Sequence, residues 1–288
     1  MTTKAQQLFN KAAQEKYAIG AFNAASLETL KAITNAAKKL SSPLLIESSP
    51  GEAKYVGIKQ LVRLARTFEE ELQIPIILNL DHGTDIDVLK EGIDEGFNYV
   101  HFDGGKLSFE ENVRIAREVV EYAHKKGVMV EGEMDHIEGS SADHTKEDTS
   151  LYARSELYTD PKKAKEFVEK TGIDVFASFV GNLHGIYANQ MHLDLERLRE
   201  IKSLLPNTYL SLHGGSGIFD DDVKQAIQLG IAKVNVNSEL RVAFKMTLQE
   251  VLNASNEIAV YKIMEKPIAA VQKVVEQKIK LFGCSGKL

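Results

Sequence analysis

The stretch YVHFDGGKLSFEENVRIAREVVEYAHKKGVMVEGE, residues 99 to 133, contains one complete strand–helix–strand unit. Two short apolar runs, Tyr99 to Asp103 and Val128 to Glu133, have the length and composition of buried parallel strands. Between them, Glu110–Lys126 carries apolar side chains at three- and four-residue steps, which is typical of an amphipathic helix. Gly127 stands where a helix commonly ends. The stretch therefore predicts a strand, a crossover helix and a second, parallel strand.

The same alternation of strand and helix patterns runs along the whole chain. No linker-like or low-complexity segment interrupts it, so a single domain spanning residues 1–288 is expected. Eight βα units predict a closed α/β barrel of the (β/α)8 or TIM type, and an open doubly wound sheet is the alternative. The predicted strands are Ala18 to Asn23, Pro43 to Ser48, Ile74 to Leu80, Tyr99 to Asp103, Val128 to Glu133, Asp174 to Val180, Thr208 to Leu212 and Lys233 to Asn237.

Two long helical segments, Ser238–Ala254 and Ile258–Phe282, follow the eighth strand. Together they are longer than one barrel unit requires. We expect them to form an extra C-terminal element of the barrel, placed at a subunit contact.

Composition narrows the class of protein. The 288 residues carry a net charge of −6 with scattered basic side chains, which argues against a nucleic-acid backbone as the main partner. The chain has neither an apolar run of about 18 residues nor an apolar N-terminal core, so no membrane association and a cytoplasmic location are expected. The single cysteine, Cys284, excludes an intrachain disulfide and a cysteine-built metal site. A metal, if bound, must use histidine and carboxylate ligands.

Three histidines follow predicted strands and each precedes a glycine: His82, His184 and His213. A barrel gathers its functional groups at the carboxyl ends of its strands, so these side chains are expected to meet. Three protein ligands with an open fourth position are typical of catalytic zinc. We therefore predict a metal site on these three histidines. The remaining histidines lack this context and are interpreted as ordinary surface or core residues: His101, His124, His136, His144 and His192.

The loops after strands seven and eight have the character of a phosphate site. They contain the glycine-rich run His213 to Gly217 and the segment Asn235 to Ser238. Exposed backbone N–H groups and a helix N-terminus at this end of a barrel favour an anion. Asp81, beside the predicted ligand His82, could exchange a proton with a substrate hydroxyl. A metal, a phosphate cradle and an acid–base group together indicate a phosphorylated carbonyl substrate, handled by an aldolase, an isomerase or an epimerase.

One segment, Asp135–Thr159, does not fit the alternation of strands and helices. It reads DHIEGSSADHTKEDTSLYARSELYT, is rich in polar residues and follows the fifth strand directly. A mobile surface loop is the simpler interpretation. Long loops after barrel strands also serve as catalytic lids, which is the alternative.

The motifs in their order resemble the class II, metal-dependent fructose-bisphosphate aldolase family, which includes the tagatose-bisphosphate aldolases. The similarity extends from about Ala5 to Gly283. It rests on Leu80-Asp81-His82-Gly83, Asp103-Gly104 with Phe109-Glu110-Glu111-Asn112, Val130-Glu131-Gly132-Glu133, Thr159-Asp160-Pro161, His184-Gly185-Ile186-Tyr187, Leu212-His213-Gly214-Gly215-Ser216-Gly217 and Lys233-Val234-Asn235-Val236-Asn237.

The resemblance implies a role for each matching residue. His82, His184 and His213 match the catalytic zinc ligands, and Asp81 matches the group that exchanges a proton with the C4 hydroxyl. Asn235 matches the side chain that contacts the enediolate. The expected substrate and phosphate contacts are Asn23, Ser49, Gly185, Gly214, Gly215, Ser216, Asn235, Val236, Asn237 and Ser238. A sodium or potassium ion beside the phosphate is also implied.

Two further expectations come from the same resemblance. Asp103 and Glu133 match carboxylates that hold a second or displaced divalent metal, although a buried, hydrogen-bonded acid is the alternative for each. In the family, an acid of the strand-five loop removes a proton from dihydroxyacetone phosphate. Here the usual Gly-Gly is replaced and two expected acids are serines, so Asp143 is the first candidate for this base, with Glu147 and Asp148 as alternatives.

The expected activity is reversible, zinc-dependent cleavage of fructose 1,6-bisphosphate to dihydroxyacetone phosphate and glyceraldehyde 3-phosphate. The alternatives are a tagatose-bisphosphate aldolase, an aldolase for another phosphorylated ketose, and a catalytically silent sugar-phosphate-binding barrel. A Schiff-base mechanism needs a lysine at the carboxyl end of a strand, whereas Lys233 is predicted to open the eighth strand. The resemblance and the long C-terminal helices favour a homodimer or a homotetramer.

Overall fold

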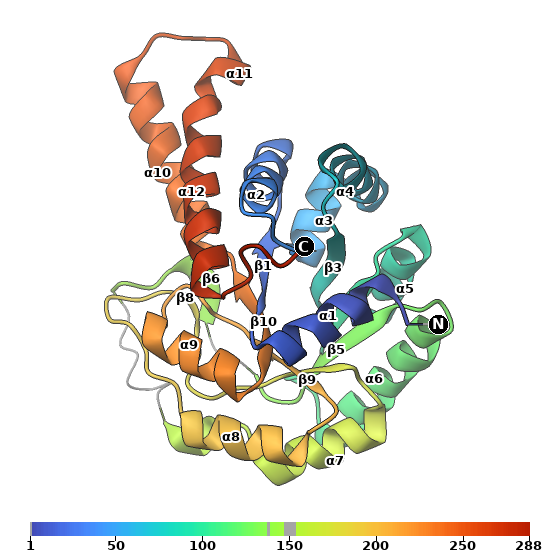
Figure 1. Cartoon of the computed structure of the whole chain (residues 1–288). Helices are drawn as coiled ribbons and strands as arrows, with labels where there is room; N and C mark the ends of the chain where they lie inside the picture. The colour runs from blue at the N-terminus through green and yellow to red at the C-terminus, as the bar shows by residue number, and fades with distance from the viewer. Residues whose placement is uncertain (1, 137–138, 147–153) are drawn as a thin grey trace.

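The computed structural model describes residues 2–136, 139–146 and 154–288, and its centre is a closed parallel barrel (Figure 1). Neighbouring strands follow the order β1-β10-β9-β7-β5-β4-β3-β2. Because β1 pairs with β10 as well as with β2, the sheet has no free edge, which confirms the barrel and excludes the open sheet. The barrel strands are β1 Ile19–Asn23, β2 Leu44–Ser48, β3 Ile76–Gly83, β4 Tyr99–Asp103, β5 Met129–Glu133, β7 Val175–Ala177, β9 Tyr209–Leu212 and β10 Ile231–Val236.

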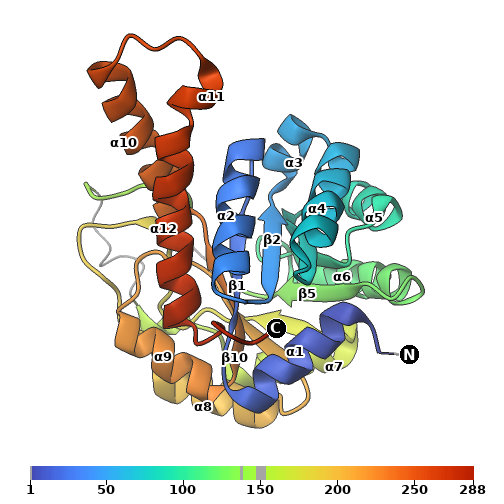
Figure 2. The same cartoon turned by 45° about the horizontal axis from the view of Figure 1, so that its top comes forward.

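Helices surround the barrel and cover its outer face (Figures 1 and 2). Side-chain caps fix the first turns of several of them, as at Ser26, Ser49 and Asp160, whose oxygens accept hydrogen bonds from backbone N–H groups. The surrounding helices are α2 Leu27–Lys39, α3 Pro50–Val56, α4 Ile58–Leu72, α5 Ile86–Glu95, α6 Phe109–His124, α7 Pro161–Thr171, α8 Leu195–Leu204 and α9 Asp220–Leu229.

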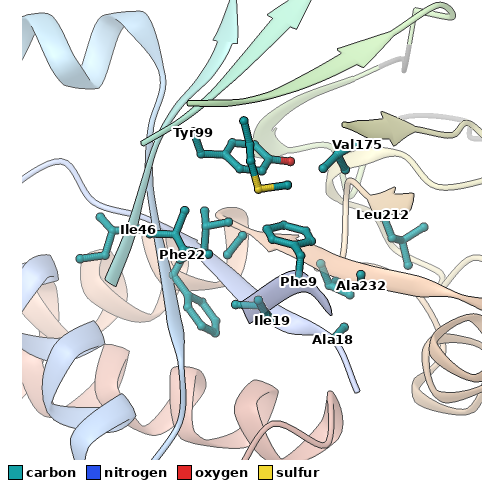
Figure 3. Packing of buried hydrophobic residues seen from close by; sticks show 14 of the residues in the cluster. Phe9, Ala18, Ile19, Phe22, Ile46, Tyr99, Val175, Leu212 and Ala232 are labelled. Carbon is teal, nitrogen blue, oxygen red and sulfur yellow. The ribbon is translucent and has the colours of Figure 1, made fainter. Parts of the chain in front are cut away.

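Helix α1, Lys4–Glu15, closes the amino-terminal mouth of the barrel. Its Phe9 side chain is fully buried, with ring centroids 5.6 Å from Tyr99 and 5.2 Å from Tyr209. These tyrosines are the first residues of β4 and β9, so Phe9 lies at the end opposite to the carboxyl ends of the strands. Figure 3 shows the ring of Phe9 among Ile19, Tyr99 and other core side chains. The carboxyl end is left for the functional groups.

The C-terminal helices are α10 Ser238–Ala254, α11 Val260–Ile263 and α12 Glu265–Leu281. The predicted helix Ile258–Phe282 is therefore divided into two. Val271, Val275 and Ile279 are buried on α12, which packs against α2 and α10. The ends of α10 and α12 joined by α11 project away from the barrel (Figures 1 and 2). None of the helices in the described part of the chain is both long and apolar enough to cross a membrane.

The segment after β5 contains more regular structure than the expected loop. Strand β6, Gly139–Asp143, pairs in parallel with β8, His184–Ile186, and a short 3-10 helix spans Ser155–Leu157. The predicted sixth strand is also shorter than expected, because β7 ends at Ala177. His184 consequently begins a strand outside the barrel and does not directly follow a barrel strand. This small sheet connects the segment after β5 to a predicted metal ligand.

Candidate active site

Asp81 and His82 are consecutive residues near the end of β3, yet both line the same cavity. Alternation along a regular strand would direct them to opposite faces. The pairing of β3 with β4 shifts register between Leu80 and Gly83, and His82 has a φ angle of 51°. In this left-handed conformation, the His82 backbone N–H donates to the His101 Nδ1 atom at 3.2 Å instead of to a regular strand partner. The irregularity brings both chemical groups to one cavity.

The three predicted metal ligands converge at the carboxyl end of the barrel. Ring centroids are 4.8 Å apart for His82 and His213, 5.0 Å for His82 and His184, and 5.7 Å for His184 and His213. The His82 Nε2 and His213 Nδ1 atoms lie 3.1 Å apart. Two nitrogens bound tetrahedrally to one zinc ion at about 2.0–2.1 Å would be about 3.3 Å apart. The donor type and this nitrogen separation therefore fit a zinc ion shared by His82 and His213. The potential ligand atoms of these two residues lie within 4.8 Å of one another and of those of Asp81 and His101, whereas His184 is placed beside them by its ring distances.

His101 is a member of this histidine cluster, which corrects its interpretation as an ordinary histidine. Its side chain is fully buried, and its ring centroid is 4.6 Å from that of His82 and 5.0 Å from that of His213. Its Nδ1 atom lies 3.3 Å from the Asp81 Oδ1 atom. The sequence offers one indication that His101 belongs to the site. It stands in β4 two residues before Asp103, and residues at this spacing lie on the same face of a strand.

Asp103 and Glu133 lie behind His82. The His82 Nδ1 atom is 3.1 Å from Asp103 Oδ2 and 4.0 Å from Glu133 Oε2. Burial raises the pKa of Glu133 to about 7, against the opposing effect of His101. Burial would also raise the pKa of Asp103, but the hydrogen bond to His82 and the charge of His101 hold it well below its usual range. These two carboxyl groups and His82 form a second group of potential metal-binding atoms.

Asp81 is a buried carboxylate on the cavity wall, with 3% of its surface exposed. Burial acts to raise its pKa, but the charge of His82, the hydrogen bond with His101 and the charge of Lys233 hold this pKa well below its usual range. The Asn235 Nδ2 atom donates to Asp81 Oδ1 at 3.4 Å. Asp81 is therefore ionised and able to accept a hydrogen bond or a proton from a hydroxyl group.

Beneath the histidines, the barrel contains a buried ionic network that sequence analysis missed. The Lys233 Nζ atom lies 2.7 Å from Glu47 and 2.6 Å from Glu131, and all three side chains are fully buried. Burial acts to lower the pKa of Lys233, but the two carboxylates outweigh it and raise this pKa well above its usual range. Lys233 lies within β10 and does not open it, and its protonated amine is a poor Schiff-base nucleophile. A lysine inside an otherwise apolar strand, as at Lys233, is the feature of the sequence that indicates such a network.

A cavity of about 190 Å³ opens beside the histidines. Gly214 has a φ angle of 65°, and a side chain there would collide with the Leu183 carbonyl group. The glycine therefore allows the chain to pass close beside the segment that leads to His184. The residues that line this cavity are Asn23, Ser49, Asp81, His82, His184, Gly185, Gly214, Ser216, Asn235, Asn237, Ser238 and Arg241.

Two residues that were expected to contact the substrate, Gly215 and Val236, are not among the residues that line the cavity. The Val236 side chain is fully buried in the hydrophobic core. Gly215 is beside the cavity-lining residues, and its N–H donates to the Asn235 carbonyl group at 3.0 Å. The side chain of Asp143 and the alternative bases Glu147 and Asp148 lie outside the described residues.

Arg241 and Glu52 are functional candidates that sequence analysis missed. The Arg241 guanidinium lies 2.8 Å from Glu52 Oε1, so a positive charge on the cavity wall is held by a carboxylate. Glu52 Oε2 also accepts hydrogen bonds from Asn23 Nδ2 and from the Ser49 backbone N–H, each at 2.9 Å. The available sequence signal is the capping box formed by Ser49 and Glu52 at the start of α3.

Comparison with known proteins gives consistent similarities. Residues 3–287 match the family described as "Fructose-bisphosphate aldolase class-II". A fructose-bisphosphate aldolase of Geobacillus stearothermophilus is 38% identical over 288 residues, which cover 98% of this chain and 97% of the relative. The crystal structure of the YdjI aldolase from Escherichia coli K12 is 30% identical, with a TM-score of 0.83 and coverage of 100% of this chain and 99% of the other. A putative fructose-1,6-biphosphate aldolase from Coccidioides immitis is also 30% identical, with a TM-score of 0.85 and coverage of 99% and 97%.

Proposed function

The chain belongs to the class II fructose-bisphosphate aldolase family, and from this premise we propose that it cleaves fructose 1,6-bisphosphate reversibly to dihydroxyacetone phosphate and glyceraldehyde 3-phosphate. Membership makes it a metal-dependent aldolase, and the histidine cluster supports zinc as the metal. The observation that carries the proposal is the convergence of His82, His184 and His213 with the carboxylate of Asp81 at one cavity.

In this proposal His82, His184 and His213 hold the zinc ion. Burial outweighs the effect of Glu131 and lowers the pKa of His213 to about 4, which favours the neutral imidazole that binds a metal. At His82 burial acts in the same direction, but the charge of Asp81 and the hydrogen bond to Asp103 outweigh it and raise the pKa to about 9, so His82 has to lose a proton to bind zinc. When bound, zinc supplies Lewis-acid stabilisation of the negative charge that develops on the substrate carbonyl oxygen. The protein contributes the fixed positions of the three imidazoles.

Asp81 is proposed to take the proton of the C4 hydroxyl during cleavage and to return it during condensation. Its ionised carboxylate faces the cavity, where a hydroxyl group can donate to it. Asn235 lies beside Asp81, and no described residue donates a hydrogen bond to the buried Asn235 Oδ1 atom. The Asn235 side chain is thus available to orient the reacting part of a substrate. Asp143 remains the proposed base for dihydroxyacetone phosphate.

The lining of the cavity is proposed to bind the two phosphates of the substrate at two separate places. Gly185 of β8, Gly214 and Ser216 after β9, and Asn237 and Ser238 at the start of α10 line the cavity and are proposed to bind one phosphate. The proposal includes Gly215 and the backbone of Val236 in this cradle, with a sodium or potassium ion beside it. Arg241 is directed toward Glu52 of α3, which follows β2, and supplies a positive charge for the second phosphate.

A displaced metal position is proposed on His82, Asp103 and Glu133, whose potential ligand atoms lie within 4.8 Å of one another. The His82 Nδ1 atom faces Asp103, whereas its Nε2 atom faces His213. The two positions share His82, so we propose them as alternative locations for the metal. The loop after strand five, where the sequence departs from the family pattern, contributes none of these three metal-binding side chains.

We propose a homodimer or a homotetramer in which the projecting C-terminal helices contact a second copy. Large apolar side chains are exposed on this element, including Ile258 at 89% and Tyr261 at 72%. Such a concentration of apolar groups is typical of an interaction surface. Light scattering of the full chain should give the mass of two or four chains, and a monomer at micromolar concentration would contradict this arrangement.

The substrate is tested by measuring cleavage of fructose 1,6-bisphosphate and tagatose 1,6-bisphosphate in parallel, with chelator-treated enzyme and with zinc restored. We expect zinc-dependent cleavage with the higher kcat/KM for fructose 1,6-bisphosphate. A higher value for tagatose 1,6-bisphosphate would assign the alternative substrate. Cleavage of neither sugar by protein with bound zinc would contradict both bisphosphate assignments.

A further inference from the structure

Two carboxylates stand behind the imidazoles that face each other at the metal site. The His82 Nε2 and His213 Nδ1 atoms are 3.1 Å apart. On their opposite sides, the His82 Nδ1 atom lies 3.1 Å from Asp103 Oδ2, and the His213 Nε2 atom lies 2.8 Å from Glu131 Oε1. Each imidazole therefore has one nitrogen directed toward the other imidazole and one nitrogen directed toward a carboxylate.

When both imidazoles are neutral, as metal ligands must be, this pairing determines where their protons are placed. An ionised carboxylate can only accept hydrogen bonds, so the nitrogen beside it carries the proton. The His82 Nε2 and His213 Nδ1 atoms then present lone pairs to the same point. Two lone pairs at this separation repel each other unless a cation lies between them, so the carboxylates prepare both imidazoles to bind a metal.

Glu131 is held firmly in place by several donors. Its Oε2 atom accepts from the Tyr99 hydroxyl at 2.7 Å and from Lys233 Nζ at 2.6 Å. Its Oε1 atom accepts from the Ser211 hydroxyl in addition to His213. The fully buried carboxylate comes from β5, whereas its donors come from β4, β9 and β10. The barrel interior itself fixes the orientation of Glu131.

Asp103 is held less firmly. About 20% of its side chain is exposed, and its Oδ1 atom accepts from the Gly105 backbone N–H at 3.2 Å. It lies at the last residue of β4, whereas Glu131 lies in the middle of β5. The orientation of His82 therefore depends on a carboxylate with more freedom than the one that orients His213.

We propose that Glu131 and Asp103 are positioning residues, which orient His213 and His82 for metal binding, and that Glu131 has the larger effect. Neither residue has to contact the metal or the substrate for this role. The inference rests on the proposed binding of zinc by His82, His184 and His213. It assigns to Asp103 a role in the main metal position, in addition to the displaced position proposed above.

The test measures zinc affinity and the rate of zinc release for the full chain, by competition with a chromogenic chelator. Glu131→Gln is expected to weaken zinc binding by about 10- to 100-fold, with Asp103→Asn changing it in the same direction by less. Asp222→Asn is the matched control, because Asp222 also pairs with an imidazole, that of His192 at 2.9 Å, at a surface outside the cavity. This control should bind zinc as the native protein does.

Tyr99→Phe is a milder variant, because it removes one hydrogen bond to Glu131 and leaves the carboxylate in place. It should weaken zinc binding slightly. If Glu131→Gln does not fold, Tyr99→Phe tests the positioning role of Glu131 in its place. Nitrogen-15 NMR of the histidines supplies a second readout. In zinc-loaded native protein we expect a slowly exchanging proton on His213 Nε2, and faster exchange of that proton in Glu131→Gln.

His213→Ala separates failure of this inference from failure of the proposed metal site. If His213→Ala loses zinc while Glu131→Gln and Tyr99→Phe keep native affinity and native proton exchange, the positioning role is wrong and the three-histidine site remains. If His213→Ala also keeps native affinity, the proposed site is wrong and the inference fails with it. Weaker binding by Asp222→Asn would likewise overturn the inference, because the loss would not be specific to the cavity.

Discussion

The conformation of His82 shows how one residue can bring neighbouring groups into a site. An L-residue in the left-handed region is less stable by roughly 1–2 kcal/mol than in the usual regions. At His82 this conformation accompanies the register shift of β3 and directs both Asp81 and His82 into the cavity. The strained residue is thus at the point where the proposed proton transfer and the proposed metal binding meet, and functional sites are a common place for such strain.

Asp81 is predicted to be needed for chemistry and not for metal binding. Asp81→Asn should retain zinc and lower kcat for cleavage by at least about 100-fold, because the amide cannot accept the hydroxyl proton. Steady-state cleavage rates and the bound zinc content measure the two effects separately. Asp221→Asn, on the exposed face of α9, is the control and should keep native rates. Native turnover by Asp81→Asn would remove Asp81 from its proposed role.

Arg241 provides a separate test of the second phosphate position. Arg241→Met should raise KM for fructose 1,6-bisphosphate by about tenfold or more with a smaller change in kcat, because a charged hydrogen bond to the phosphate is lost. Arg199→Met is the matched control, since Arg199 pairs with Glu196 on the outer helix α8. An unchanged KM in Arg241→Met would place the second phosphate elsewhere.

Among the elements, α1 acts as a plug for the amino-terminal mouth of the barrel. Its capping box, in which Thr3 and Gln6 exchange hydrogen bonds, fixes the start of the helix. The fully buried Phe9 then fills the space between Tyr99 and Tyr209. This element is remote from the cavity at the carboxyl ends of the strands, so its contribution is expected to be to stability.

Phe9→Ala is predicted to lower the free energy of unfolding by about 3–5 kcal/mol, because it leaves a cavity in a close-packed core. Chemical denaturation measures this loss, and the protein that remains folded should keep native kcat. Leu27→Ala, at a side chain that is 41% exposed, is the control and should change stability by less than about 0.5 kcal/mol. A large loss of kcat in folded Phe9→Ala would show that α1 acts on the site.

The elements also show what could be predicted from sequence. The eight barrel strands were predictable because each is a short apolar run and most are followed by a helical period. The pairing of β6 with β8 was not, since neither short, polar segment has a strand pattern, and their contact depends on the folded barrel. For the same reason His184 was expected directly after a barrel strand, although it begins β8.

At the scale of the whole molecule, the site was only partly readable from the sequence. His82, His184 and His213 were recognisable because each histidine precedes a glycine near a strand end. His101 and Glu131 were missed because they lie inside strands, where a polar side chain has meaning only when the closed barrel brings its partners together. Local patterns thus identify groups at the rim of the barrel, whereas interior networks depend on tertiary packing.

The central claim is that zinc on the three histidines is required for aldol cleavage. The most direct measurement is a zinc titration of chelator-treated enzyme while cleavage of fructose 1,6-bisphosphate is followed, with His184→Ala measured beside the native chain. We predict negligible cleavage before zinc is added, recovery that saturates at about one zinc ion per chain, and no recovery in His184→Ala. Full cleavage by native protein shown to be free of zinc, or by His184→Ala without bound metal, would contradict the account.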